Sequence, residues 1–343
     1  MPLRLNAALA VILVCLGAVA PARAVDEDVN AYVNGNFEAM SAEQRALSVE
    51  MERAIDRAAT SPDLRLRVLA APWISMQQRI TKPEVRFPTA KELADAAQGS
   101  TDPYVLAVMA AICRGAMVPG CSTTDFLHRW TAVAPQDARA WLNLAMWERS
   151  QGHEAASVQA FKKIATANEL SDPQAMGLQI AISATKDGSS SSQDQLVLAA
   201  QASATASLVT LPLSGPTQWC GTDDTVALAC RHLADLMLER GGLLDFGLAL
   251  AIVDRLPATT PTERQRLAIE KKAYFWALGR PTTCYLDRAL NKKPESPDCS
   301  DTDWLNRVAA LGEVRYAKAE LQRLGVSVAD AAAAYDHDLA AAH

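Results

Sequence analysis

The side chains best suited to acid–base or metal chemistry in this sequence are its histidines. There are five, His128, His153, His232, His337 and His343. No two of them lie four residues apart with a glutamate between them, so the helical zinc-protease pattern is absent. A single histidine on a helix is more often packed or solvated than ligating. We therefore predict no metal site, and nothing in the sequence indicates a cofactor.

Two acidic groups, Asp223-Asp224 and Asp301-Thr302-Asp303, have the residue types of a calcium site or of a glycosidase pair. Each lies at or just before the expected start of a helix. Carboxylates there cap free amides and favour the positive end of the helix dipole. Capping explains both groups, and the sequence has no nucleophile elbow, phosphate-binding loop or dinucleotide fingerprint. No catalytic residue is assigned, although a Ser-His-Asp set or a carboxylate pair assembled by the fold stays open.

The first 24 residues have the three regions of a cleavable signal peptide. Arg4 gives a positive start, residues 7–20 are apolar, and Ala22-Arg23-Ala24 is a small-x-small cleavage site. The apolar run is short for a membrane span, and Val14 before Cys15 does not suit lipid modification. An uncleaved anchor and a lipoprotein are thus the weaker alternatives. We predict a periplasmic or secreted protein with no membrane span after cleavage.

The mature chain is mildly acidic. Removal of Arg4 and Arg23 changes the net charge from −6 to −8. With no cluster of Lys or Arg, this balance argues against nucleic acid as a partner.

The cysteines indicate disulfide bonds rather than thiol chemistry. Loss of Cys15 with the leader leaves an even number, and none forms a Cys-x-x-Cys motif. They fall into three sequence-local couples that would close short loops: Cys113 with Cys121, Cys220 with Cys230, and Cys284 with Cys299.

The elements that carry these residues are predicted to be helices. Ala, Leu, Arg, Glu and Gln are abundant, and alternating strand patterns are nearly absent. Capping and proline signals predict helices that open at 41, 61 and 89, and further helices over 261–279, 303–324 and from 326 onward. The fold class is predicted to be all-α.

The stretch from 135 to 164 predicts an antiparallel helical hairpin. Trp141, Leu144 and Ala145 share one helix face, Gly152 suits a tight turn, and Phe161 begins the apolar stripe of a second helix.

These residues resemble the tetratricopeptide repeat (TPR). Glu148 departs from the family pattern where an aromatic is usual, and Ile164 is larger than the usual alanine. Pro135 suits the end of a preceding unit, so units are expected over 104–137 and 138–171, with a degenerate unit around 227–260. The matching residues are Trp141, Leu144, Ala145, Gly152, Ser157 and Phe161, then Cys230, Leu233, Ala234, Met237, Gly241, Leu250 and Val253.

The resemblance implies antiparallel hairpins stacked as a TPR-like α-solenoid, with a possible division into arrays 25–187 and 188–343 at the polar run 187–192. It also implies that a bond between Cys113 and Cys121 clamps a hairpin turn, and that Cys220 ties an approach segment to the helix of Cys230. First helices of such units line a concave surface that binds peptides. The inward positions would be Arg139, Leu142, Met146, Arg149 and Ser150, and downstream Leu228, Arg231, Asp235 and Glu239.

The function expected from this architecture is a non-catalytic periplasmic scaffold that binds another protein or peptide, possibly in envelope assembly. The alternatives are an all-α hydrolase that acts on the envelope through an acidic site, and an inhibitor or immunity-type protein. Two convergent acids or histidines in a pocket would favour the enzyme. A groove along the first helices would favour the scaffold.

Overall fold

The computed structural model describes residues 53–77, 89–116, 120–185, 226–257, 259–289 and 303–341, together with single positions between 198 and 221. The expected signal peptide and most of the helix expected from 41 lie outside these ranges. Within them the regular elements are helices and there is no strand, which confirms the all-α prediction. One isolated bridge joins Asp137 to Glu169. No helix in the described ranges is long and apolar enough to cross a membrane.

Residues 53–59 are helical, and four further helices follow, the last two of which form the first hairpin. They are α4 (Leu64–Gln77), α5 (Ala90–Ala97), α6 (Pro103–Ala116) and α7 (Thr123–Val133). The helix expected to open at Thr89 is present, and Thr89 caps it: its side chain accepts from the amide of Glu92 at 3.2 Å, and the Glu92 carboxylate accepts from the amide of Thr89 at 2.8 Å. α6 and α7 pack against each other as a hairpin.

The best-matched unit forms the next hairpin, made of α8 (Ala138–Ser150) and α9 (Glu154–Lys163) and followed by the 3₁₀ turn η1 (Ile164–Thr166). Gly152 turns the chain with a φ of +80°, a region that favours glycine. Ser157 is fully buried, and its hydroxyl donates to the carbonyl of Ala145 at 2.8 Å. A small residue there lets the two helices approach closely.

Two of the expected disulfides are present. Cys113 in α6 is bonded to Cys121, just before α7, with their Cα atoms 5.2 Å apart. Cys220 is bonded to Cys230 in α13 (Ala227–Arg240), with their Cα atoms 5.7 Å apart. The first bond spans the hairpin turn and the second ties the preceding segment to a helix, as predicted. The side chain of Cys284 and all of Cys299 lie outside the described residues.

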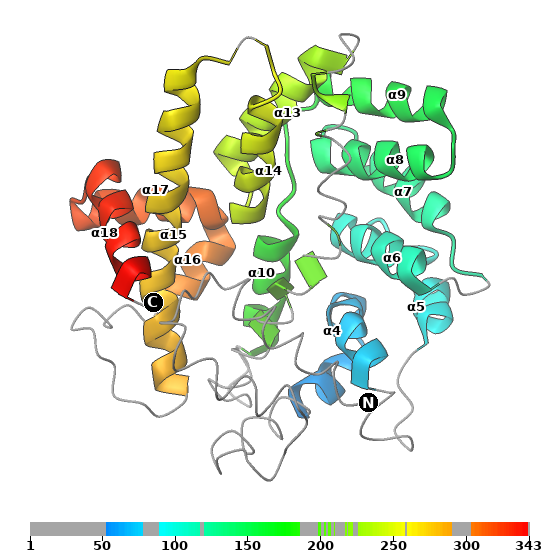
Figure 1. Ribbon diagram of the computed structural model, residues 1–343. Coiled ribbons are helices and arrows are strands. Elements are labelled where there is room, and N and C mark those ends of the chain that lie inside the picture. Colours follow the sequence, from blue (N-terminus) through cyan, green and yellow to red (C-terminus); the bar gives the residue numbers. More distant parts are fainter. Residues whose placement is uncertain are drawn as a thin grey trace.

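Helix α10 (Pro173–Thr185) lies near the centre of the molecule, between α6–α9 and α16–α18 (Figure 1). Its main packing partner is α16 (Trp304–Leu311), which is more than a hundred residues away in the sequence. The third hairpin, α13 with α14 (Leu243–Val253), packs against η1 through α13. Each hairpin therefore contacts the next one along the chain or the turn before it, and α10 contacts the C-terminal helices.

The C-terminal helices differ from the expected ones at two residues, Pro281 and Gly312. α15 (Pro261–Ala289) continues past the expected end at 279 and contains Pro281, and α15 packs along α17 (Glu313–Leu324) and α18 (Val328–Ala341). This packing offsets the cost of about 3 kcal/mol for a proline inside a helix. The helix expected over 303–324 is interrupted at Gly312, whose φ is +78°. The interruption places Glu313 at the first position of α17.

Candidate functional site

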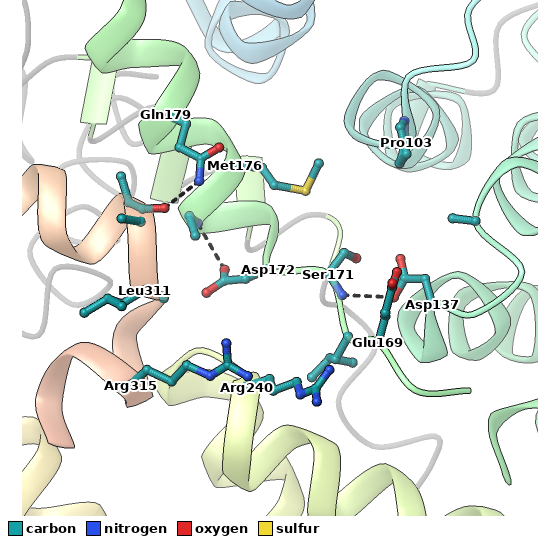
Figure 2. A pocket seen from close by; sticks show the side chains of 16 residues that line it. Pro103, Asp137, Glu169, Ser171, Asp172, Met176, Gln179, Arg240, Leu311 and Arg315 are labelled. Atoms are coloured by element: carbon teal, nitrogen blue, oxygen red, sulfur yellow. Dashed lines mark hydrogen bonds between the residues drawn. The ribbon is translucent and has the colours of Figure 1, made fainter. Parts of the chain in front are cut away.

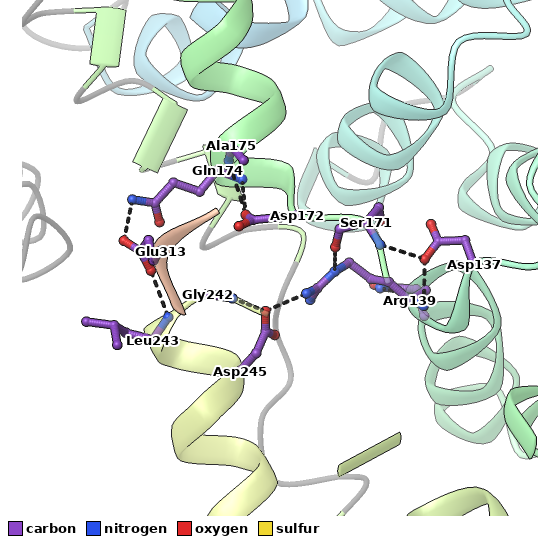
Figure 3. Close-up of polar contacts among 11 residues, drawn as sticks. Asp137, Arg139, Ser171, Asp172, Gln174, Ala175, Gly242, Leu243, Asp245 and Glu313 are labelled. Carbon is purple, nitrogen blue, oxygen red and sulfur yellow. Dashed lines mark hydrogen bonds and ion pairs between the residues drawn. The ribbon is translucent and has the colours of Figure 1, made fainter. Parts of the chain in front are cut away.

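Four helix N-termini meet at the centre of the molecule, and carboxylates cap three of them, those of α8, α10 and α14 (Figure 3). Asp137 accepts from the amide of Arg139 at the start of α8 at 3.0 Å. Asp172 accepts from the first amides of α10 at 3.0 and 3.1 Å. Asp245 and Glu313 both cap α14, accepting from Gly242 at 2.9 Å and Leu243 at 2.7 Å, and Glu313 itself begins α17. We call Asp137, Arg139, Asp172, Asp245 and Glu313 the junction cluster.

Arg139 is the one cation of the junction cluster. Its Nη2 donates to Asp245 at 2.6 Å and its Nε donates to the carbonyl of Ser171 at 2.6 Å. The two side chains of this ion pair are 1% and 5% exposed. Burial lowers the pKa of Arg139, but the charge and hydrogen bond of Asp245 outweigh it and hold the pKa above its usual range. The pair connects α8 to α14 across 106 residues of sequence.

Two acids of the junction cluster bind protons unusually tightly. Burial, and then the charge of Asp172, raises the pKa of Glu313 to about 8. Burial, and then the charge of Asp245, raises the pKa of Asp172 to about 6. Oδ2 of Asp172 is buried and has no hydrogen-bond partner among the described residues. At neutral pH the cluster therefore retains a proton on Glu313.

A pocket of about 410 Å³ opens beside the junction cluster, between α10, the α16–α17 turn and the end of α13 (Figure 2). Met176, Leu311 and several alanines give it an apolar wall, and Asp137, Glu169 and Asp172 give it acidic groups on one side. Arg240 and Arg315 lie together along the lower edge of the view in Figure 2, where Glu169 is beside Arg240. A volume of this size with a mainly apolar wall and a few polar groups is typical of ligand sites.

The two arginines at the pocket edge converge on one carboxylate oxygen. Nε of Arg240 lies 3.4 Å from Oε1 of Glu239, and Nη2 of Arg315 lies 3.6 Å from the same oxygen. Arg240 also donates through Nη1 to the carbonyl of Asn168 at 2.6 Å. The side chains of Arg240, Arg315 and Glu239 are 35%, 45% and 60% exposed.

The positions expected to face a concave groove on α8 do not form one surface. Arg139 and Leu142 are buried in this structure: the first is paired with Asp245 and the second packs in the core. Met146 and Arg149 are half-buried, and the Arg149 guanidinium lies 4.6 Å from the Trp219 ring centre. Ser150 is exposed.

The downstream positions lie on α13. Leu228, Asp235 and Glu239 are exposed, and Arg231 is half-buried in ion pairs at 3.1 Å with both Asp235 and Glu263. None of the residues proposed from the sequence lines the pocket, although Glu239 contacts both of its arginines.

No site role was predicted from the sequence for Asp172, Arg240, Gly312, Glu313 or Arg315. Asp172 alone has a local signal, since it precedes Pro173 in the order of an N-cap followed by proline at the first helical position. The approach of Glu313 and Arg315 to α10 and α13 had no comparable signal, because it depends on packing between distant helices.

In the described part of the chain, the histidines do not pair with one another but contact carboxylates or a carbonyl. Glu148 lies 2.7 Å from Nδ1 of His153 and 3.8 Å from Nε2 of His128, and Nε2 of His232 contacts the carbonyl of Ala167 at 2.6 Å. Across the described ranges, no group of three or more His, Cys, Asp or Glu side chains has the arrangement of a metal site.

Comparison with known proteins finds no family model, no curated protein and no solved structure that matches this chain.

Proposed function

We propose that the protein is a non-catalytic scaffold that binds a peptide or a segment of another protein, and that the pocket beside the junction cluster is its binding surface. The observation that carries this proposal is the combination in one open pocket of an apolar wall with two partly exposed arginines. An apolar wall with a polar edge suits a peptide, because side chains bury against the wall while the polar edge orients the chain.

The arrangement of the helices supports a scaffold. Three antiparallel hairpins, α6–α7, α8–α9 and α13–α14, follow one another, and the sequence of the central one resembles a TPR unit at Trp141, Gly152 and Phe161. We propose that these hairpins form a TPR-like array, which α10 and the C-terminal helices close on one side. Such an array presents a rigid surface on which a flexible partner is held.

The disulfides support a site of action outside the reducing cytoplasm. Together with the leader expected over residues 1–24, they favour the periplasm or secretion. A peptide-binding scaffold in that compartment would serve envelope assembly.

The experiment is a capture comparison with two matched variants. Ala310 is exposed and lines the pocket, whereas Ala333 is exposed on α18 and does not line it. Ala310→Trp fills the pocket and Ala333→Trp adds the same side chain elsewhere. A partner captured by the wild type and by Ala333→Trp, but lost with Ala310→Trp, supports the pocket as the binding surface. Equal capture by all three proteins contradicts it.

The acidic side of the pocket favours a second candidate, a hydrolase that acts on an envelope polymer. An acid with a pKa raised to about 6 beside a pocket has the property of a general acid. If Asp172 has this role, the release of soluble fragments from an envelope-polymer suspension falls above pH 6 and is lost in Asp172→Asn. Release that is absent from the wild type at any pH excludes this candidate.

A further inference from the structure

We infer that Arg240 and Arg315 form a clamp for the C-terminal carboxylate of a bound peptide, and that Glu239 occupies this clamp in the free protein. The inference rests on the proposed function and names the chemistry of its ligand. It starts from the fact that two guanidinium groups from different helices lie within 4 Å of a single carboxylate oxygen.

The clamp is built from elements that fix its two arginines independently. Arg240 ends α13 and is held by its 2.6 Å hydrogen bond to the carbonyl of Asn168. Arg315 lies in the first turn of α17, just after the break at Gly312. Guanidinium groups are suited to carboxylates because their N–H donors match the carboxylate geometry.

Glu239 is a weak occupant. Its side chain is 60% exposed and its ion pairs with the two arginines are 3.4 and 3.6 Å long. Exposed ion pairs of this kind contribute about 0–1 kcal/mol, since water screens them and the side chains lose freedom. A ligand carboxylate that also buries an apolar group beside it can therefore displace the Glu239 side chain.

The surroundings favour one terminal carboxylate over an acidic segment. Leu311 lies near Arg315, Met176 lines the pocket farther from the clamp, and both offer an apolar surface for the last side chains of a peptide (Figure 2). Asp137, Glu169 and Asp172 line the same pocket and repel additional negative charges. A free C-terminus that ends in an apolar residue meets both conditions.

The test uses a fluorescein-labelled pool of tetrapeptides that end in leucine with a free carboxylate, and the same pool ending in leucine amide. Binding to the full mature protein is measured by fluorescence polarisation. We expect the acid pool to bind roughly tenfold more tightly than the amide pool, which is the effect of one charge-assisted contact. Arg315→Gln should bring the acid pool to the level of the amide pool, and Glu239→Gln should tighten only the acid pool.

The controls separate this inference from the proposed function. Ala310→Trp should weaken both pools and Ala333→Trp neither. Equal binding of the two pools that Ala310→Trp still blocks overturns the clamp and leaves the scaffold in place. No binding by the wild type, or binding that Ala310→Trp does not change, overturns both. Weaker acid-pool binding by Glu239→Gln overturns the role given to Glu239.

Discussion

Arg139 is held on three sides by the structure that surrounds it. Asp245 accepts from its guanidinium, the carbonyl of Ser171 accepts from Nε, and Asp137 caps its backbone amide. Removing a charge from water is costly, and such a pair is favourable only when hydrogen bonds compensate its desolvation. The loss of either partner therefore leaves the other charged and unpaired in the interior.

We expect Arg139→Met to lower the free energy of unfolding by about 3–5 kcal/mol, because it leaves Asp245 buried without its cation. Chemical denaturation monitored by circular dichroism measures this change. Asp245→Asn provides the control, since the amide oxygen still accepts from Gly242. The double variant should be less destabilised than the sum of the two single variants, and simple additivity would contradict a direct pairing.

At the scale of the elements, the central feature is the convergence of helix N-termini. α8, α10, α14 and α17 begin near the same point, and each terminus has free amides and a partial positive charge. The capping acids satisfy amides of α8, α10 and α14, but burial and the charges of neighbouring carboxylates raise the pKa values of Glu313 and Asp172. The junction of the four helices is consequently sensitive to pH.

The sign of this sensitivity follows from Glu313. Its pKa is raised from 4.5 to about 8 in the folded protein, so the folded state holds a proton that the unfolded chain releases. The stabilisation is complete below pH 4.5 and is lost as the pH rises to about 8. The pKa of Asp172 is raised from 3.8 to about 6, so this group also loses its stabilisation as the pH rises, over a lower pH range. Each pKa unit corresponds to about 1.4 kcal/mol, so the effect amounts to a few kcal/mol.

We expect Glu313→Gln to match the wild type near pH 5 and to exceed its stability near pH 8, since the amide resembles the protonated acid and Gln174 can turn its own amide to match. Thermal unfolding across this pH range measures the effect. Glu320 is a matched control, because hydrogen bonds from Arg323 lower the pKa of this buried acid. Glu320→Gln should be most harmful near neutral pH. A pH dependence of Glu313→Gln equal to that of the wild type would refute the assignment.

The disulfide across the first hairpin makes a separate contribution at this scale. Cys113 and Cys121 close a loop of eight residues of sequence separation, and the chain-entropy estimate for such a loop is about 2.5 kcal/mol. The double variant Cys113→Ala/Cys121→Ala should lose about this amount in urea denaturation, with the helical content retained. Reductant should lower the free energy of unfolding of the wild type by more than this amount, because it also breaks the Cys220–Cys230 bond.

At the scale of the whole molecule, the N-terminal and C-terminal helices share one continuous core. α10 packs on α16, and Gln174 and Gln179 donate to Glu313 and to the carbonyl of Ala309, each at 2.7 Å. η1 also packs on α13, which follows the polar run in the sequence. The parts before and after the polar run 187–192 are therefore joined by buried polar contacts as well as by apolar packing.

We expect the protein to unfold in one cooperative transition, because the separation of the two parts would expose this shared core and unpair the junction cluster. Differential scanning calorimetry should give a calorimetric enthalpy equal to the van't Hoff enthalpy. Arg139→Met should shift the whole transition to lower temperature. Two resolved transitions in the wild type would show that the parts unfold independently.

The sequence alone determined the features that depend on neighbouring residues. The helical class, the helix that opens at Thr89 and the turn at Gly152 were predicted, since propensity and turn geometry act over a few positions. The pairings of Cys113 with Cys121 and of Cys220 with Cys230 were predicted for the same reason, because each joins residues close in sequence.

Only the tertiary structure decided which charged side chains meet. Arg139 has the spacing of an inward groove residue, yet it is buried against an aspartate 106 positions away. The sequence predicted neither the break of the expected 303–324 helix at Gly312 nor the continuation of α15 through Pro281. Arg315 and Arg240 converge because α17 lies against α13. The energies that place such residues come from burial and long-range pairing, which have no period or spacing along the chain.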